Sequence, residues 1–175
     1  MGKKRLRSTI INVIIIFALI CGMYIGFITN RDNSSNQLNI FSVIQIFDNY
    51  SAQLNGSFIV SFFSILIHNY ILDIFYSIIS CLTLGVTGII NSFLNGNTFG
   101  YVLQLNHNIY NVFFVSLEAI SMAILTSCGA NIGWTLIIKN KSIELKKIKQ
   151  ALLIVFILLA IAALIETFTI KEILK

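Results

Sequence analysis

Asn95-Gly96-Asn97-Thr98-Phe99-Gly100 is a polar, glycine-bearing stretch between long apolar segments near the middle of the chain. The apolar segment before it runs from Tyr70 to Leu94, and the next long one runs from Asn111 to Ile138. Backbone that leaves a helix inside a membrane must be covered by protein or by water. We therefore expect a helix break here, either a surface loop or a packed bend inside the fold. Its candidate residues are Asn95, Gly96, Asn97 and Gly100.

The composition is that of an integral membrane protein. Of the 175 residues, 57% are hydrophobic and only 11% are charged, whereas about 25% of a typical soluble domain is charged. The basic residues behind the net charge of +5 lie beside hydrophobic segments, which indicates membrane orientation and not nucleic-acid binding. The three cysteines show no zinc-binding spacing, so we expect no metal and no cofactor. The fold class expected is an all-α, polytopic helix bundle that forms one membrane domain over residues 1–175.

The first third of the chain predicts a basic tail, a membrane helix and a loop. Residues 1–9 hold four cations and form the expected cytoplasmic tail. The apolar run from Ile10 to Ile28 is longer than the apolar region of a signal peptide, and no A-x-A site follows it. We interpret it as an uncleaved first helix. Residues 29–57 are expected to form an external loop, and the short apolar stretch 58–67 an interfacial helix.

Three further long segments carry the membrane-spanning signal. Tyr70 to Leu94 is expected to be the second spanning helix, Asn111 to Ile138 another, and Gln150 to Phe168 the last. Small residues inside such helices allow a neighbouring helix to pack closely. The glycines expected to serve this role are Gly85, Gly88, Gly129 and Gly133.

The two basic clusters predict one more crossing than the obvious segments provide. Residues 1–7 and 139–149 contain nine of the twelve Lys and Arg residues, and both clusters should face the cytoplasm. An even number of crossings must then lie between them, but only three long segments are evident. The hidden crossing lies either at 58–67 or around 92–105, and we favour the second, as a short or broken helix. About five crossings result, with the amino terminus inside and the carboxyl terminus outside.

Ionisable residues within the apolar segments form the candidate site. Asp73, Glu118 and Glu166 fall at one membrane level on this topology, with Asp73 just inside the outer end of its helix. A charged group at the centre of a membrane helix costs about 2.5 kcal/mol or more, and such groups often mark function. They either form an ion or proton site or lock helices together, or they are simply solvated near the headgroups. Our hypothesis for Glu118 is that it links helices by hydrogen bonds. The polar cluster expected at this level also includes His68, Asn69 and His107.

Catalysis is not expected from this chain. It has no G-x-S-x-G serine elbow, no H-E-x-x-H zinc helix and no phosphate-binding G-x-x-x-x-G-K-[ST] loop. Any coupling to ATP would therefore need a partner subunit.

The order of motifs resembles the stage II sporulation protein M family over residues 58–170. His68-Asn69 stands where that family has paired asparagines, and Asn95-Gly96 with Gly100 matches its asparagine-glycine turn. Glu118-Ala119-Ile120 followed by two glycines matches its glutamate segment, and Ile165-Glu166-Thr167-Phe168 its terminal motif. The chain departs from the family at Phe113-Phe114-Val115, where proline, histidine and glycine are usual.

The resemblance implies a scaffold without catalytic activity in the bacterial cell membrane. Sporulation members of the family are similar to scaffolds for cell-wall-remodelling partners. Other small members are similar to accessory proteins of circular bacteriocins that work with an ABC transporter in export or immunity. The partners implied are therefore the lipid bilayer and other membrane proteins, with self-association left open. The alternative from the residues themselves is an ion- or proton-coupled transporter or channel that uses Asp73, Glu118 and Glu166.

Overall fold

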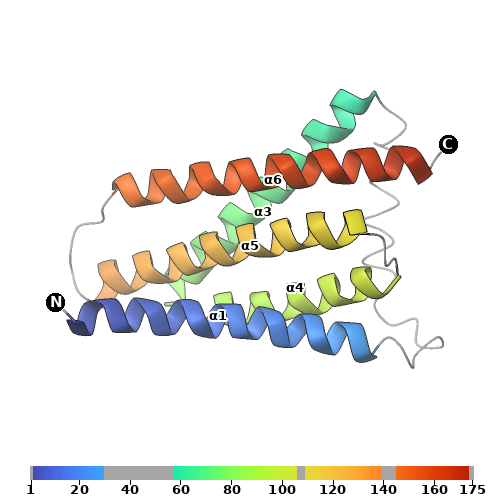
Figure 1. The fold of residues 1–175 in the computed structure, drawn as a ribbon. Helices are drawn as coiled ribbons and strands as arrows, with labels where there is room; N and C mark the ends of the chain where they lie inside the picture. The colour runs from blue at the N-terminus through green and yellow to red at the C-terminus, as the bar shows by residue number, and fades with distance from the viewer. Residues whose placement is uncertain (1, 30–56, 106–108, 139–144, 174–175) are drawn as a thin grey trace.

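The fold is an all-α bundle, as the sequence predicts. The computed structural model describes residues 2–29, 57–105, 109–138 and 145–173. In this part of the chain most helices run side by side along one axis and one helix, drawn in green, crosses them obliquely; the two termini lie at opposite ends of the bundle (Figure 1). The elements are α1 (Gly2–Thr29), α3 (Phe58–Leu82), α4 (Val86–Leu105), α5 (Ile109–Gly133), the short π-helix η1 (Trp134–Ile138) and α6 (Leu145–Ile173).

Four of these helices are long and apolar enough to cross a membrane. The spans are Thr9–Thr29, Phe58–Leu82, Ile109–Ile138 and Leu145–Thr169. Large apolar side chains such as Phe17, Phe75 and Ile157 are exposed on α1, α3 and α6. A water-soluble protein rarely exposes continuous apolar surface of this extent. The protein is therefore embedded in a membrane, with these faces in contact with lipid.

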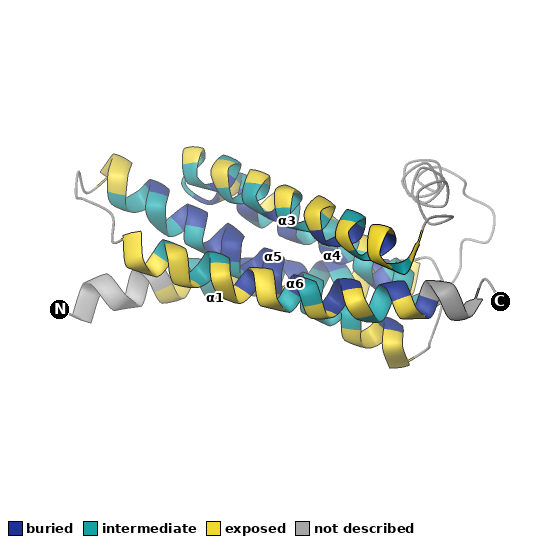
Figure 2. Ribbon diagram, turned by 90° about the horizontal axis from the view of Figure 1, so that it is seen from above, coloured by how far each residue is buried: buried dark blue, intermediate teal, exposed yellow. Residues whose placement is uncertain are grey.

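α5 is the central helix of the bundle. It packs against α1, α3, α4 and α6. Half of the residues in its most apolar 18-residue stretch are buried, compared with 22–28% in the other three spans. Figure 2 shows this burial along α5, while the outer faces of α3 and α6 are exposed. One apolar core lies between α3, α5 and α6 around Leu125 and Leu159. A second lies between α1 and α5 around Ile15 and Met122.

The prediction of one helix from Tyr70 to Leu94 is wrong, because the chain turns at Thr83–Gly85. The amide of Gly85 donates to the carbonyl of Ser80 at 2.8 Å, and that of Leu84 to the carbonyl of Cys81 at 3.4 Å. These two bonds form the Schellman motif that ends a helix. Leu84 and Gly85 both have positive φ, 54° and 96°, and glycine adopts that region without a side-chain clash.

The expected interfacial helix at 58–67 is also wrong, since these residues form the first part of α3. Ser57 caps the helix, and its hydroxyl oxygen accepts from the amide of Val60 at 3.4 Å. A serine at this position satisfies a backbone donor that has no partner within the helix. The helix then continues past His68-Asn69 without a break. The apolar run is short in the sequence only because these polar residues lie inside the helix.

The expected break at Asn95, Gly96, Asn97 and Gly100 is absent, because all four residues lie inside α4. α4 packs beside α1 and parallel to it, so Gly96 lies at the backbone of Leu19 and Gly100 at that of Met23. Gly22 and Gly26 of α1 lie in turn at Phe93 and Asn97.

A Cβ atom at any of these four glycines would come within 3.0 Å of the other helix's backbone. Gly-x-x-x-Gly in both helices thus permits a backbone contact that no larger residue allows. The glycine-bearing stretch is therefore a helix-packing face.

The polar side chains of this stretch bond within α4 itself. The side-chain amide of Asn95 donates to the backbone carbonyl of Asn91 at 2.9 Å. The hydroxyl of Thr98 donates to the backbone carbonyl of Leu94 at 3.3 Å. Such bonds to the preceding turn satisfy polar side chains without opening the helix. α4 begins at Val86 and lies between α3 and α5 in the chain, where charge parity calls for a further crossing. It is not among the helices long and apolar enough to span a membrane, so a crossing by α4 stays a prediction.

Candidate functional site

The three intramembrane acids come from three different helices. Asp73 lies on α3, Glu118 on α5 and Glu166 on α6, each inside a span of sufficient length and hydropathy to cross the membrane. Asp73 is buried, with 7% of its surface exposed, and the two glutamates are half-buried. The carboxylates of Glu166 and Asp73 lie within electrostatic reach of that of Glu118. The α3–α5–α6 group therefore contains a polar cluster, defined here as these three acids with Asn69 and Ser121.

Two hydrogen bonds between helices hold the polar cluster together. The amide nitrogen of Asn69 on α3 donates to Oε1 of Glu118 on α5 at 2.5 Å. The hydroxyl of Ser121 on α5 donates to Oδ2 of Asp73 on α3 at 2.9 Å. The same hydroxyl lies 2.8 Å from the carbonyl oxygen of Glu118. Lipid supplies no competing donors or acceptors, so bonds of this kind resist separation of α3 from α5.

Asp73 lies deeper in the bundle than the sequence indicates. With α3 beginning at Phe58, Asp73 follows that start by fifteen residues, or about 22 Å of helix. The expectation that Asp73 lies just inside a helix end rested on a helix beginning at Tyr70, and that expectation is wrong. At this depth water is scarce, and the carboxyl group relies on its protein partner.

One of the two histidines expected in the polar cluster lies in the described part of the chain. His68 lies on the exposed side of α3, one residue and about 100° of helical rotation away from Asn69. His107 lies outside the described residues. Ser121 was missed by the sequence analysis, because a serine in an apolar run reads as a small packing residue. Its spacing of three residues from Glu118 is the signal that places both on one helical face.

The four glycines proposed for helix packing have distinct places. Gly129 and Gly133 of α5 lie against the backbone of Ser77 and Cys81 on α3. Gly88 faces the side chains of Ser80 and Thr126, whereas Gly85 lies in the turn before α4. The hydroxyl of Ser80 donates to the carbonyl of Thr126 at 3.0 Å. Close packing and hydrogen bonding thus act together where α3 meets α5.

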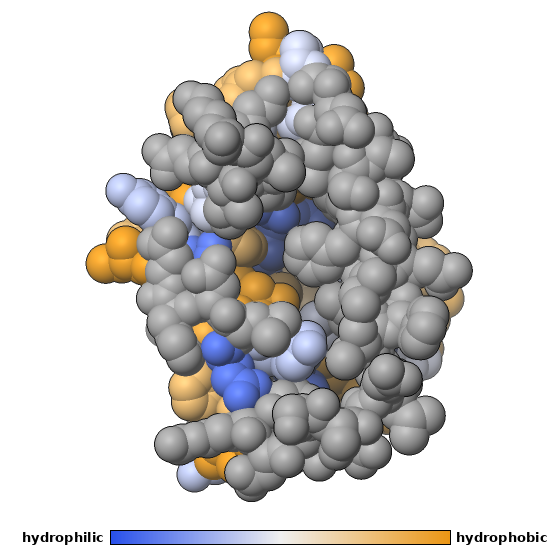
Figure 3. Space-filling view, turned by 90° about the vertical axis from the view of Figure 1, so that its right-hand side faces the viewer, coloured by the Kyte–Doolittle hydropathy of each residue, from blue (hydrophilic) through white to orange (hydrophobic). Residues whose placement is uncertain are grey.

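Among the described residues, potential metal ligands do not gather into a metal centre. Over residues 2–29, 57–105, 109–138 and 145–173, no group of three or more His, Cys, Asp or Glu side chains could hold a metal ion. The polar cluster can accept hydrogen bonds and exchange protons, and both bonded pairs link α3 to α5. Figure 3 views the bundle from the end opposite the amino terminus, where hydrophilic surface shows among apolar surface.

Comparison with protein-family models, with curated proteins and with solved structures finds no match to this chain.

Proposed function

We propose that this protein is a non-enzymatic membrane scaffold of the stage II sporulation protein M type, an accessory subunit that assembles with other membrane proteins. The observation that supports this proposal is the bonding of the polar cluster. Asn69 bonds Glu118, and Ser121 bonds Asp73, so these acids are engaged with neighbouring helices of the same chain. Acids used in this way fix the shape of a bundle, and a fixed shape is what a scaffold presents to its partners.

The resemblance gives two settings for such a scaffold. One is export of a bacteriocin, or immunity to it, together with an ABC transporter. The other is a cell-wall-remodelling complex in sporulation. In both settings the chain lies in a bacterial cell membrane, with the amino terminus in the cytoplasm and the carboxyl terminus outside. The first turns of α1 carry basic residues, and so do those of α6 at Lys146, Lys147 and Lys149. The first turns of α1 and those of α6 lie at the same end of the bundle (Figure 1). The positive-inside rule places basic helix ends of this kind in the cytoplasm.

An ion- or proton-coupled transporter is the second candidate, and the electrostatic contact between Glu118 and Glu166 favours it. Carboxylates that face one another within a membrane are typical of proton relays. Glu118→Gln separates the two functions, because glutamine keeps an oxygen that accepts from Asn69 but cannot carry a proton.

The test uses purified protein in liposomes under an imposed proton or cation gradient. The scaffold predicts that flux stays at the level of protein-free liposomes, for the wild type and for Glu118→Gln alike. Photo-cross-linking from lipid-facing positions of α6 in cells, such as Ile154, should then yield a discrete complex that Glu118→Gln preserves. Flux that appears with the wild type and disappears with Glu118→Gln would establish the transporter instead.

A further inference from the structure

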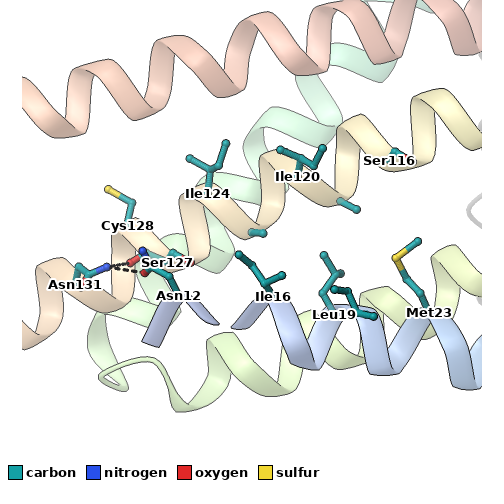
Figure 4. A pocket seen from close by; sticks show the side chains of 13 residues that line it. Asn12, Ile16, Leu19, Met23, Ser116, Ile120, Ile124, Ser127, Cys128 and Asn131 are labelled. Atoms are coloured by element: carbon teal, nitrogen blue, oxygen red, sulfur yellow. Dashed lines mark hydrogen bonds between the residues drawn. The ribbon is translucent and has the colours of Figure 1, made fainter. Parts of the chain in front are cut away.

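A groove between α1 and α5 lies apart from the polar cluster. Its volume is about 610 Å³, within the range of small-molecule sites. Ile16, Leu19 and Met23 line it from α1, and Ile120, Ala123 and Ile124 from α5 (Figure 4). The three acids are not among the lining residues. An apolar ligand is therefore the chemistry that this groove fits.

The groove covers only part of the length of the helices that line it. Its lining on α1 extends from Asn12 to Met23, eleven residues or about 16 Å of helix. On α5 the lining extends from Ser116 to Asn131, fifteen residues or about 22 Å of helix. The groove therefore covers about half to three-quarters of a hydrocarbon core that is about 30 Å thick. A transmembrane helix docked against α1 would run on along the rest of that helix. An acyl chain is also shorter than the full hydrocarbon core, so a groove of this length accommodates one chain.

The groove has a pair of polar residues at the amino-terminal end of the bundle. There the amide nitrogen of Asn131 donates to Oδ1 of Asn12 at 3.0 Å and to the carbonyl of Ser127 at 2.8 Å (Figure 4). Asn12 uses its oxygen in this pair, so its amide nitrogen can donate to an ester or phosphate oxygen. Basic residues follow on the first turns of α1, at Lys3, Lys4, Arg5 and Arg7. Cations at this level attract anionic lipid headgroups.

We propose that the groove binds one acyl chain of an anionic phospholipid from the leaflet at the amino-terminal end of the bundle. The chain lies between Ile16 and Ile120, the ester region meets Asn12, and the phosphate lies at the basic turns of α1. Apolar lining, a length that accommodates one acyl chain and the basic sequence of the first turns of α1 together support this occupant. The proposal adds a lipid ligand to the proposed scaffold and does not depend on any protein partner.

The groove is tested with the full chain in nanodiscs of equimolar phosphatidylglycerol and phosphatidylcholine. Native mass spectrometry after release measures the lipid that stays bound, and one phosphatidylglycerol per chain is expected. The double variant Ile16→Phe/Ile120→Phe fills the groove from both walls and should lower retention about tenfold, equivalent to about 1.4 kcal/mol. Ile157→Phe/Ile161→Phe, at similarly exposed positions on α6, is the matched control and should retain the lipid.

The basic end is tested separately with Lys4→Gln/Arg5→Gln/Arg7→Gln. In this variant the preference for phosphatidylglycerol over phosphatidylcholine should fall about tenfold, while the groove still accepts an acyl chain. Lys146→Gln/Lys147→Gln/Lys149→Gln removes the same charge from α6 and should keep the preference.

Equal retention of both lipids by the wild type would overturn the proposal, as would equal loss in the groove and control variants. Dimers that the groove variant abolishes would assign the groove to a second copy instead. Circular dichroism and monodispersity are measured first, and Ile120→Phe alone carries the test if the double variant does not fold.

Discussion

Ser121 is the side chain through which α5 reaches the carboxylate of Asp73. Its hydroxyl lies 2.9 Å from Oδ2 of Asp73, and Asp73 is buried in the middle part of α3. A buried acceptor that loses its donor bears the cost of burial without compensation. The bond between Ser121 and Asp73 therefore stabilises the pair α3–α5 beyond apolar packing.

Ser121→Ala should lower the free energy of unfolding by about 1 kcal/mol, because hydrogen bonds between membrane helices contribute on this scale. Ser116→Ala is the matched control on the same helix, since the hydroxyl of Ser116 bonds only the carbonyl of Val112 in its own helix. Reversible unfolding in detergent micelles measures both. Equal losses in the two variants would show that the bond to Asp73 contributes nothing.

Sequence reasoning could name the acids but not their partners. An aspartate or glutamate stands out in an apolar segment, so Asp73, Glu118 and Glu166 were identified without coordinates. The depth of Asp73 in the membrane and the position of His68 within a helix both depend on where α3 begins. Polar residues inside that helix concealed its start in the sequence. Serine and asparagine are common in this chain, so neither Ser121 nor the Asn12–Asn131 pair could be distinguished from packing residues.

At the scale of elements, α4 is the helix that sequence reasoning described least well. Charge parity required a hidden crossing and pointed to the region around 92–105, yet the glycines and asparagines there were read as a break. Glycine costs a helix about 1 kcal/mol relative to alanine, which favours that reading when the helix is considered alone. The matching pair Gly22 and Gly26 lies on α1. Only the spatial pairing of α1 with α4 shows that both sets belong to one contact.

Gly96→Leu should therefore destabilise the bundle, because a side chain at Gly96 meets the backbone of Leu19. Overpacking of this kind costs about 1–3 kcal/mol, and a backbone that cannot move aside places the cost in the upper part of that range. Thr98→Leu, two residues away and exposed, should change stability by less than about 0.5 kcal/mol. Thermal or denaturant unfolding of both variants measures the difference. A Gly96→Leu protein as stable as Thr98→Leu would mean that α1 and α4 do not pack at their glycines.

At the scale of the whole molecule, alternating helix directions fix which ends share a side of the membrane. Ser57 caps the start of α3, and Lys146 lies in the first turn of α6. Three helices, α3, α4 and α5, lie between them. If all three cross, the two residues lie on opposite sides, whereas a non-crossing α4 would place them on the same side.

Ser57→Cys should react with a membrane-impermeant maleimide in intact cells, and Lys146→Cys only after permeabilisation. Both positions are exposed, and Cys21, Cys81 and Cys128 are replaced by alanine to remove background labelling. Labelling of both positions from one side would contradict a crossing by α4. Exchange of the two sides would reverse the proposed orientation and leave the fold intact.

Glu118 acts as a hydrogen-bond acceptor between helices, and the pair Glu118→Gln and Glu118→Leu measures how much this bond contributes to stability. Glutamine retains an oxygen for the amide of Asn69 and removes the repulsion by Glu166 and Asp73. Leucine leaves Asn69 without this acceptor. We predict a free energy of unfolding within about 0.5 kcal/mol of the wild type for Glu118→Gln and a loss of about 1–2 kcal/mol for Glu118→Leu. A Glu118→Leu protein as stable as the wild type would contradict it.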